Sequence, residues 1–185
     1  MTLIPHVFIQ GTAQPVVLFH GWGFDSQIWL PLLPGLSEQY QLHLVDLPGF
    51  GLTPHMEWDL FKSALLKQLP AKFALIGWSM GGLLATRLAI EAPEQVTHLI
   101  NVTSSPHFIR ENQWPGVAPP IFKKFYQALT DNPQQTLQEF ITLQLQGQKI
   151  VTGEPPSLNG LRTGLDLLMN WDLRQNLSQL KQPVG

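Results

Sequence analysis

The chain has 185 residues, 44% hydrophobic and 13% charged, which is enough apolar material for one globular domain with a core. A net charge of -2 without a long run of like charges excludes the usual basic surface of a nucleic-acid-binding protein. No cysteine is present, so disulfides, thiol catalysis and cysteine-ligated zinc are excluded. The first residues lack a signal-peptide pattern and no apolar run approaches about 18 residues, so we expect a cytoplasmic protein without a membrane span.

In the first 103 residues, apolar runs of strand length alternate with amphipathic stretches of helix length. Strands are expected at residues 6–11, 15–20, 41–46, 72–78 and 97–103. Helices are expected at residues 26–40, where two prolines interrupt the pattern, and at 56–69 and 80–91. This alternation predicts an α/β fold, with a mostly parallel sheet and helices on both faces.

The texture changes after residue 103, where the chain becomes rich in glutamine and proline. Residues 104–170 show no convincing strand, and helices are expected at 121–129, 135–145 and 161–170. A strand-free excursion of this length after a sheet strand predicts a helical lid. Residues 171–185 are expected to return to the core 1–103, as a helix over 172–182 followed by Pro-Val-Gly where another strand would begin.

The strongest chemical motif is G-x-S-x-G at residues 77–81, with Ser79 at its centre. An apolar strand leads into the motif and a helix leaves it, the setting that a nucleophile elbow requires. Its two glycines would let strand and helix approach, and the helix beginning at Met80 would direct its positive end at an oxyanion. The alternative is a glycine-rich helix start with a capping serine. The context favours Ser79 as the catalytic nucleophile.

A second glycine-flanked loop, H-G-W-G at residues 20–23, follows the second expected strand. Acyl transfer needs two N–H donors aimed at the developing alkoxide, and the backbone amides of Trp22 and Met80 are the expected pair. His20 could act as a general base, but we favour a structural role in which it braces the loop. Trp22 and Trp78 are expected to line an acyl pocket.

The remaining motifs have simpler interpretations. D-L-P-G-F-G at residues 46–51 is interpreted as a tight turn. The G-x-G patterns at 21–23 and 49–51 lack the third glycine of a dinucleotide-binding fingerprint, so a Rossmann-type cofactor site is not expected. The six histidines show no metal-ligand spacing, and we predict no metal and no other cofactor.

These motifs, in this order, resemble the α/β-hydrolase superfamily. The resemblance is strongest to the family of pimeloyl-[acyl-carrier protein] methyl ester esterases of biotin synthesis, through H-G-W-G, L-H-L-V-D-L-P-G-F-G, G-W-S, S-S-P, W-P-G and D-L-R-Q. It implies a serine carboxylesterase acting on the methyl ester of a pimeloyl chain held by acyl carrier protein. Ser79 would be the nucleophile, with Trp22 and Met80 at the oxyanion. The implied acyl-channel residues are Phe140, Ile141, Thr142, Leu143 and Gln144.

The chain departs from the family in two ways. The family's triad takes its aspartate after the seventh strand and its histidine after the eighth, whereas this chain ends after the sixth core strand in that numbering. The other possible acid position, residues 101–107, has no carboxylate, and His107 has no evident acid to orient it. We therefore expect a chain that is nearly inactive alone, with an uncovered sheet edge open to self-association. The arginines that contact the carrier protein in the family are not matched at residues 134–140.

Three functions stay open at this point. The first is the esterase, and the second is a catalytically dead acyl-binding pseudoenzyme. The third is another serine hydrolase of the superfamily, such as a lipase-like enzyme or a C–C bond hydrolase. The serine argues against dehalogenases and epoxide hydrolases, which use a carboxylate nucleophile.

Overall fold

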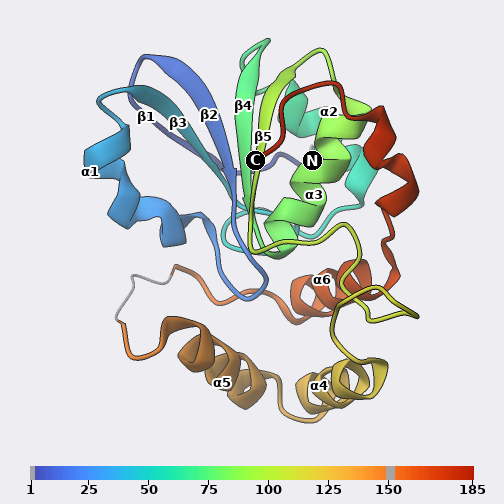
Figure 1. Cartoon of the computed structure of the whole chain (residues 1–185). Helices are drawn as coiled ribbons and strands as arrows, with labels where there is room; N and C mark the ends of the chain where they lie inside the picture. The colour runs from blue at the N-terminus through green and yellow to red at the C-terminus, as the bar shows by residue number, and fades with distance from the viewer. Residues whose placement is uncertain (1–2, 149–152) are drawn as a thin grey trace.

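The computed structural model describes residues 3–148 and 153–185 and contains one five-stranded sheet (Figure 1). Its strands are β1 (Val7–Gln10), β2 (Gln14–Phe19), β3 (Tyr40–Val45), β4 (Phe73–Trp78) and β5 (Val96–Val102). They lie in the order β1-β3-β2-β4-β5, with β1 antiparallel to β3 and the other neighbours parallel. The predicted α/β fold with a mostly parallel sheet is confirmed.

Helices cover both faces of this sheet. On one face lie η1 (Ser26–Leu32) and α1 (Leu33–Leu36), and on the other lie α2 (Trp58–Leu66) and α3 (Met80–Glu91). The chain continues with α4 (Pro119–Asp131), α5 (Pro133–Leu145), α6 (Leu158–Asn170) and η2 (Arg174–Gln179). Strand β2 is apolar from Pro15 to Phe19 because both of its faces are buried. Val17 and Phe19 belong to the larger core cluster with α2 and α3, whereas Val16 and Leu18 belong to the smaller cluster beside α1. A strand buried on both faces needs apolar residues at every position.

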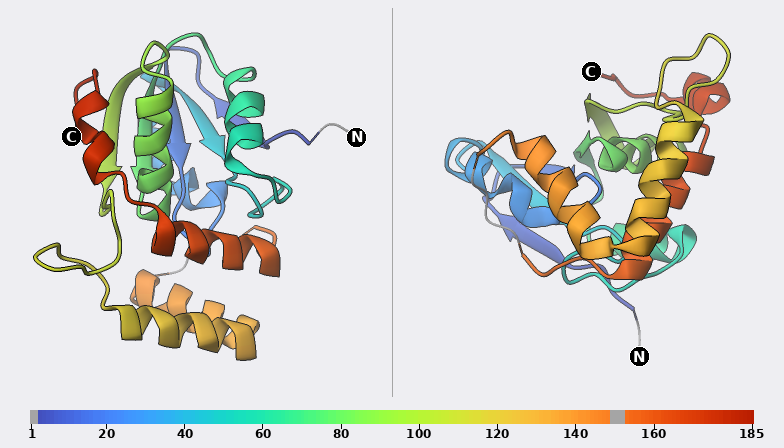
Figure 2. Two further views of the ribbon diagram at one scale, coloured as in Figure 1. Left: turned by 90° about the vertical axis from the view of Figure 1, so that its right-hand side faces the viewer. Right: turned by 90° about the horizontal axis from the view of Figure 1, so that it is seen from below.

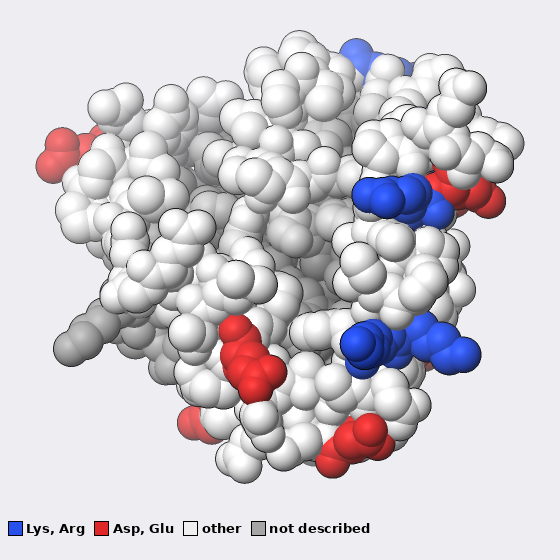
Figure 3. Space-filling model, turned by 60° about the horizontal axis from the view of Figure 1, so that its bottom comes forward, with Lys and Arg blue, Asp and Glu red and all other residues white. Residues whose placement is uncertain are grey.

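Helices α4, α5 and α6 form a separate layer below the carboxyl ends of the parallel strands (Figures 1 and 2), which we call the helical layer. Helix α6 lies between the sheet and the other two helices (Figure 2). Leucines of α6 and apolar residues of α4 belong to the larger core cluster, so the layer is packed onto the α/β body. Its exposed lower face is mostly uncharged and carries both signs of charge (Figure 3).

All three helices of the layer begin earlier than the sequence pattern predicts. Pro119 and Pro133 open α4 and α5, in the first-turn positions where proline loses no hydrogen bond. Ser157 caps α6, because its Oγ accepts a hydrogen bond from the N–H of Gly160 at 3.0 Å. The range 104–170 expected for the lid also includes residues 149–152, which lie outside the described residues.

The predicted helix over 172–182 is wrong, because only the short 3₁₀ helix η2 forms there. The Asp172 carboxylate accepts the N–H of Arg174 at 3.1 Å, a local turn that competes with a regular helix. Beyond η2, Leu99 N–H donates to Pro183 O at 3.0 Å and Gly185 N–H donates to Leu99 O at 2.9 Å. The edge of β5 that was expected to be uncovered is therefore paired at this point, where a further parallel strand was predicted to begin.

No helix among the described residues has both the length and the apolar character needed to span a membrane.

Candidate active site

Ser79 lies at the turn between β4 and α3. Its φ of 54° and ψ of -118° put a non-glycine residue at positive φ, a conformation that costs free energy and is kept only where the surroundings impose it. The Ser79 N–H donates to Val102 O of the neighbouring strand at 2.9 Å, and the side chain is half-buried. The strand–turn–helix setting expected for the motif is therefore confirmed. The catalytic role of Ser79 stays a prediction.

The two motif glycines are required by close backbone contacts. A Cβ on Gly77 would lie 2.5 Å from the carbonyl oxygen of Gly81 and 2.5 Å from Cα of Gly82, inside van der Waals distance. A Cβ on Gly81 would collide with the carbonyl oxygens of Phe19 and His20. Glycine at these positions lets α3 begin directly against the ends of β2 and β4.

This packing brings the two expected oxyanion donors into one region. Met80 is the first residue of α3, so its N–H has no partner within the helix and lies at the positive end of the helix dipole. The side chains of Trp22 and Met80 both flank Gly164 of α6, where a Cβ would lie 2.7 Å from Trp22 Cδ1 and 3.0 Å from Met80 Sδ. The loop and the helix start are neighbours, as an oxyanion hole requires.

His20 braces the loop and does not face the nucleophile. The ring is fully buried, with Nδ1 2.8 Å from Gly21 O and Nε2 accepting the N–H of Leu47 at 2.9 Å. Desolvation by burial lowers the pKa of His20 to about 4, so the ring is neutral at pH 7. Both ring nitrogens are occupied, and the structural role favoured from the sequence is confirmed.

The indole of Trp22 is almost fully buried, and its expected place in an acyl pocket stays a prediction. Only 2% of Trp22 is exposed, and its Nε1–H donates to Leu161 O at 2.8 Å. The ring packs edge-on against Phe125 and Phe140, with centroids 5.4 and 4.9 Å away. The side chain fills the space between loop and helical layer, which leaves the Trp22 backbone N–H as the group that can serve catalysis.

A cavity of about 520 Å³ lies between the loop after Trp22 and α5. Its apolar walls come from Phe24, Ile28, Leu137, Ile141 and Leu145. The ring of Phe24 also contacts Trp78, with centroids 5.0 Å apart, and Trp78 immediately precedes the nucleophile. Phe24 is therefore a wall of this cavity and also a neighbour of the strand end that precedes Ser79, although Ser79 itself is not a lining residue.

Only part of the expected acyl-channel run faces this interface. Phe140 packs on Trp22, and Ile141 lines the cavity. Thr142, Leu143 and Gln144 are exposed, with Leu143 70% exposed, and the structure does not place them beside the cavity. A helix turns about 100° per residue, so five consecutive residues cannot share one face.

Two polar residues near the site were not found by sequence reasoning. Ser104 Oγ donates to the carbonyl oxygen of Ser79 at 2.7 Å and so holds the strained turn from the β5 side. Residues 46–51 form a turn as interpreted from the sequence, and the Asp46 side chain also holds neighbouring segments together. Its buried carboxylate accepts the N–H of Ser26 at 2.8 Å and of Leu52 at 2.9 Å, and it pairs with His6 at 3.0 Å. The only sequence signal was a polar residue directly after each apolar strand.

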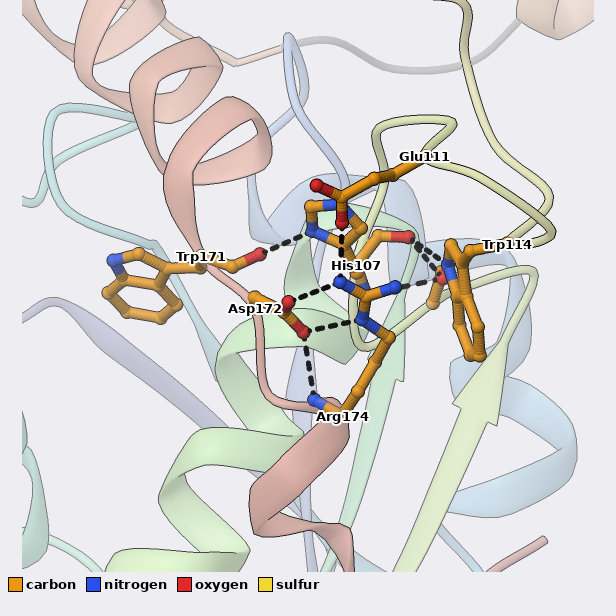
Figure 4. Close-up of polar contacts among 7 residues, drawn as sticks. His107, Glu111, Trp114, Trp171, Asp172 and Arg174 are labelled. Atoms are coloured by element: carbon orange, nitrogen blue, oxygen red, sulfur yellow. Dashed lines mark hydrogen bonds and ion pairs between the residues drawn. The ribbon is translucent and has the colours of Figure 1, made fainter.

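His107 has acidic neighbours, contrary to the expectation from the sequence (Figure 4). Its Nε2 lies 3.9 Å from Glu111 Oε2, and its Nδ1 lies 3.3 Å from Trp171 O. Arg174 joins Glu111, at 2.8 Å, to Asp172. These contacts connect the segment that enters the helical layer to the segment that leaves it. The ring nitrogens of His107 are directed at these partners.

The same cluster is the one place among the described residues where metal-ligand atoms gather. Ligand atoms of His107, Glu111 and Asp172 lie within 4.8 Å of one another. The Arg174 guanidinium already pairs with both carboxylates, and its hydrogen bonds lower the pKa of Asp172 to about 2. A metal ion would have to compete with this fixed cation, so we assign no metal to the cluster.

The comparison with known families gives the class of protein. A model of the alpha/beta hydrolase family matches residues 16–175, which include the whole elbow and most of the helical layer. The chain belongs to the alpha/beta hydrolase family. The prediction of a carboxylic ester hydrolase is confirmed at the level of the family.

Curated relatives narrow the comparison. The chain is 57% identical over 181 residues to the pimeloyl-[acyl-carrier protein] methyl ester esterase of Legionella pneumophila (strain Corby), covering 97% of this chain and 76% of the relative. It is 38% identical over 190 residues to the enzyme of the same name from Aliivibrio salmonicida (strain LFI1238), covering 95% and 73%. The resemblance inferred from the motifs is confirmed by these relatives.

Solved structures agree on the fold. An esterase from Exiguobacterium antarcticum superimposes with a TM-score of 0.83 at 21% identity, covering 97% of this chain and 75% of that protein. A bromoperoxidase from Bacillus anthracis gives 0.82 at 22% identity, with the same coverage. At such identities the likeness supports the fold alone.

Proposed function

We propose that the chain is a serine carboxylesterase whose substrate is an acyl ester, in particular the methyl ester of a pimeloyl group carried by acyl carrier protein. The observation that carries the proposal is the backbone of Ser79, at positive φ between a buried strand and the start of a helix. A capping serine would need no such strain. The names of the curated relatives support the substrate.

In the proposed reaction, Ser79 Oγ attacks the ester carbonyl carbon and the backbone amides of Trp22 and Met80 stabilise the oxyanion. The serine proton goes to a general base and then to the leaving methoxide, which departs as methanol. Water attacks the acyl-enzyme and releases the free acid. Within residues 3–148 and 153–185, neither a histidine nor a carboxylate hydrogen-bonds to the Ser79 hydroxyl. We therefore expect the 185-residue chain by itself to turn over slowly.

The acyl chain is proposed to occupy the cavity beside Phe24. Its apolar walls and its volume of about 520 Å³ suit an extended aliphatic chain. Phe140 supports the wall through its ring contact with Phe24, with centroids 6.5 Å apart. In this arrangement the helical layer acts as the lid that was expected from the sequence.

The charges on the helical layer offer little support for recognition of an acidic carrier protein. Cations of the described layer and its entry segment are Arg110, Lys123, Lys124 and Arg162, against the carboxylates Glu111, Asp131, Glu139, Glu154 and Asp166. With Lys149, which lies outside the described residues, cations and carboxylates are equal in number over 104–170, and both signs appear on the lower face (Figure 3). An acidic carrier would therefore gain little long-range attraction here.

Labelling by a fluorophosphonate probe tests the nucleophile. We expect slow labelling of the chain that is absent in Ser79→Ala, because loss of a triad base costs on the order of a millionfold in turnover but leaves the oxyanion hole. Labelling that persists in Ser79→Ala would refute the assignment. Ordinary turnover of p-nitrophenyl butyrate would show instead that a base does reach Ser79.

A second candidate is an acyl-binding protein without chemistry. It is favoured by one observation: the chain has a cavity with apolar walls under the helical layer, whereas Ser79 has no base among the described residues. Complete absence of labelling at long times, together with binding of a long-chain methyl ester, would support it. Turnover of short methyl esters in preference to long acyl chains would point to another hydrolase of the superfamily.

A further inference from the structure

A second, smaller cavity lies on the other side of the helix α3 start. Its volume is about 260 Å³, and it is enclosed by the start of α2, by α3 and by α6. Its apolar walls are Leu47, Phe50, Met56, Met80, Leu84 and Leu167. It shares no lining residue with the cavity beside Phe24. Met80 is nevertheless part of its wall, so the cavity adjoins the proposed oxyanion region.

Arg87 lies among the polar lining residues of this cavity, between two tryptophans. The guanidinium carbon is 4.2 Å from the ring centroid of Trp171 and 5.2 Å from that of Trp58. The two indoles meet edge to face, with centroids 5.4 Å apart. The guanidinium therefore lies against two aromatic rings, a cation–π arrangement that does not use its N–H groups.

Only one of these edges has a partner among the residues that the structure describes. Arg87 Nε donates to Glu91 Oε1 at 2.7 Å. Glu91 Oε2 meanwhile accepts from Lys62 Nζ at 2.6 Å and from Trp58 Nε1 at 2.9 Å. The Glu91 carboxylate thus accepts hydrogen bonds from three donors. Its negative charge is shared between Lys62 and Arg87 and does not fully balance the charge of Arg87. The terminal nitrogens of Arg87 are available to an anion in the cavity.

The charged residues that line the cavity are one cation and two carboxylates, which differ in their surroundings. Arg87 is the one cation among the described lining residues. The two carboxylates of the lining, Glu57 and Asp59, are exposed, and Asp59 is paired with Lys62 at 3.3 Å. Water screens exposed charges, whereas the Arg87 guanidinium rests on two aromatic faces.

We propose that this cavity, with Arg87 at its polar end, is a binding site for a short-chain aliphatic carboxylate. The carboxylate would accept hydrogen bonds from the terminal nitrogens of Arg87, and the chain would lie on the apolar wall formed by Leu84 and Met80. Ester hydrolysis releases a carboxylic acid, so a site of this chemistry would sense acids of the product class next to the oxyanion region. The proposal does not depend on Ser79 being a nucleophile.

Titration with hexanoate, followed by two-dimensional ¹H–¹⁵N NMR, tests the site. We expect the indole N–H signals of Trp58 and Trp171 to shift, and hexanoate to bind at least about tenfold more tightly than the uncharged hexanamide, because a guanidinium–carboxylate pair is a charge-assisted hydrogen bond. Arg87→Gln should abolish this preference. Lys124→Gln removes one positive charge from the exposed face of α4 and should leave it unchanged.

Two further measurements keep the outcome clear if Arg87→Gln fails to fold. Thr163→Phe narrows the cavity without touching an ion pair and should weaken hexanoate binding about tenfold or more. Ser79→Ala should bind hexanoate as the unchanged protein does, whatever the outcome of the labelling experiment. Equal affinities for hexanoate and hexanamide, or shifts confined to Ile141 and Leu145 of the other cavity, would overturn the proposal.

Discussion

Replacing Gly77 with alanine tests the packing that creates the nucleophile turn. The new Cβ would lie 2.5 Å from Gly81 O and 2.5 Å from Gly82 Cα, both backbone atoms of the start of α3. Normal contact needs about 3.5 Å, so helix and strand must separate by roughly 1 Å. Because rigid backbone cannot yield as a flexible side chain would, we expect a cost of about 3 kcal/mol, the upper end for an inserted methyl group.

Urea unfolding of Gly77→Ala gives the magnitude, with Gly35→Ala as the matched control. Nothing lies within 4 Å of a Cβ built on Gly35, which sits in α1. The control should therefore be neutral or more stable by about 0.5–1 kcal/mol, through reduced freedom of the unfolded chain. For Gly77→Ala we expect a midpoint lower by about 1.5 M, taking about 2 kcal/mol per M for a chain of this size.

The same variant should change the site as well as the stability. A displacement of about 1 Å at the helix start moves the Met80 N–H, and misplacement on this scale can cost about a hundredfold in rate. Fluorophosphonate labelling of Ser79 should fall accordingly, measured at a temperature where the variant is still folded. If Gly77→Ala unfolds within about 0.5 kcal/mol of Gly35→Ala, the close approach of β4 and α3 is not present in solution and the reasoning fails.

Three other expectations concern the supports of the site. The pKa of buried His20, about 4, lies below its unfolded value of 6.5, so the unfolded chain binds more protons between these values and stability falls as pH drops from about 6.5 towards 4. Urea midpoints across this range should fall less steeply for His20→Gln and should keep the original slope for the exposed control His55→Gln. Ser104→Ala should cost about 1 kcal/mol and slow the labelling of Ser79, with Ser104→Thr restoring part of both; an unaltered labelling rate would remove Ser104 as a support of the turn. Phe140→Ala should destabilise the protein by about 3 kcal/mol and weaken binding of long acyl esters. Leu143→Ala, at a 70% exposed position, should change stability by no more than about 0.5 kcal/mol. Similar thermal-shift results for the two variants would contradict the placement of α5.

The core of the fold could be read from local signals. Helix α3 was expected at residues 80–91 and spans Met80–Glu91, because a glycine motif starts it and Pro93 prevents its continuation. Strands β2 and β4 were found because both faces are buried and the whole run is apolar. In each case the residues that set the element lie within it or at its ends.

What the sequence did not reveal depends largely on contacts between distant residues. The burial of Trp22 follows from Leu161 and Phe140, more than a hundred residues further along the chain. The acid near His107 is Glu111, only four residues further along the chain, but its link to Asp172 depends on Arg174 from beyond the helical layer. Side chains such as Ser104 look unremarkable in the sequence and gain a role only when the end of β5 meets the nucleophile turn.

The turn at Ser79 and the helical layer are held by different kinds of contact. The turn at Ser79 is over-determined, since backbone contacts at Gly77 and Gly81 and the hydrogen bond from Ser104 act on the same few atoms. The helical layer touches this region mainly through aromatic faces, such as Phe140 on Trp22, which tolerate changes of side chain more readily than backbone contacts do. Under the proposed function, we therefore expect substitutions on the exposed surface of the layer to leave the labelling of Ser79 unchanged, and shape and apolar contact to contribute more than charge to ester selection.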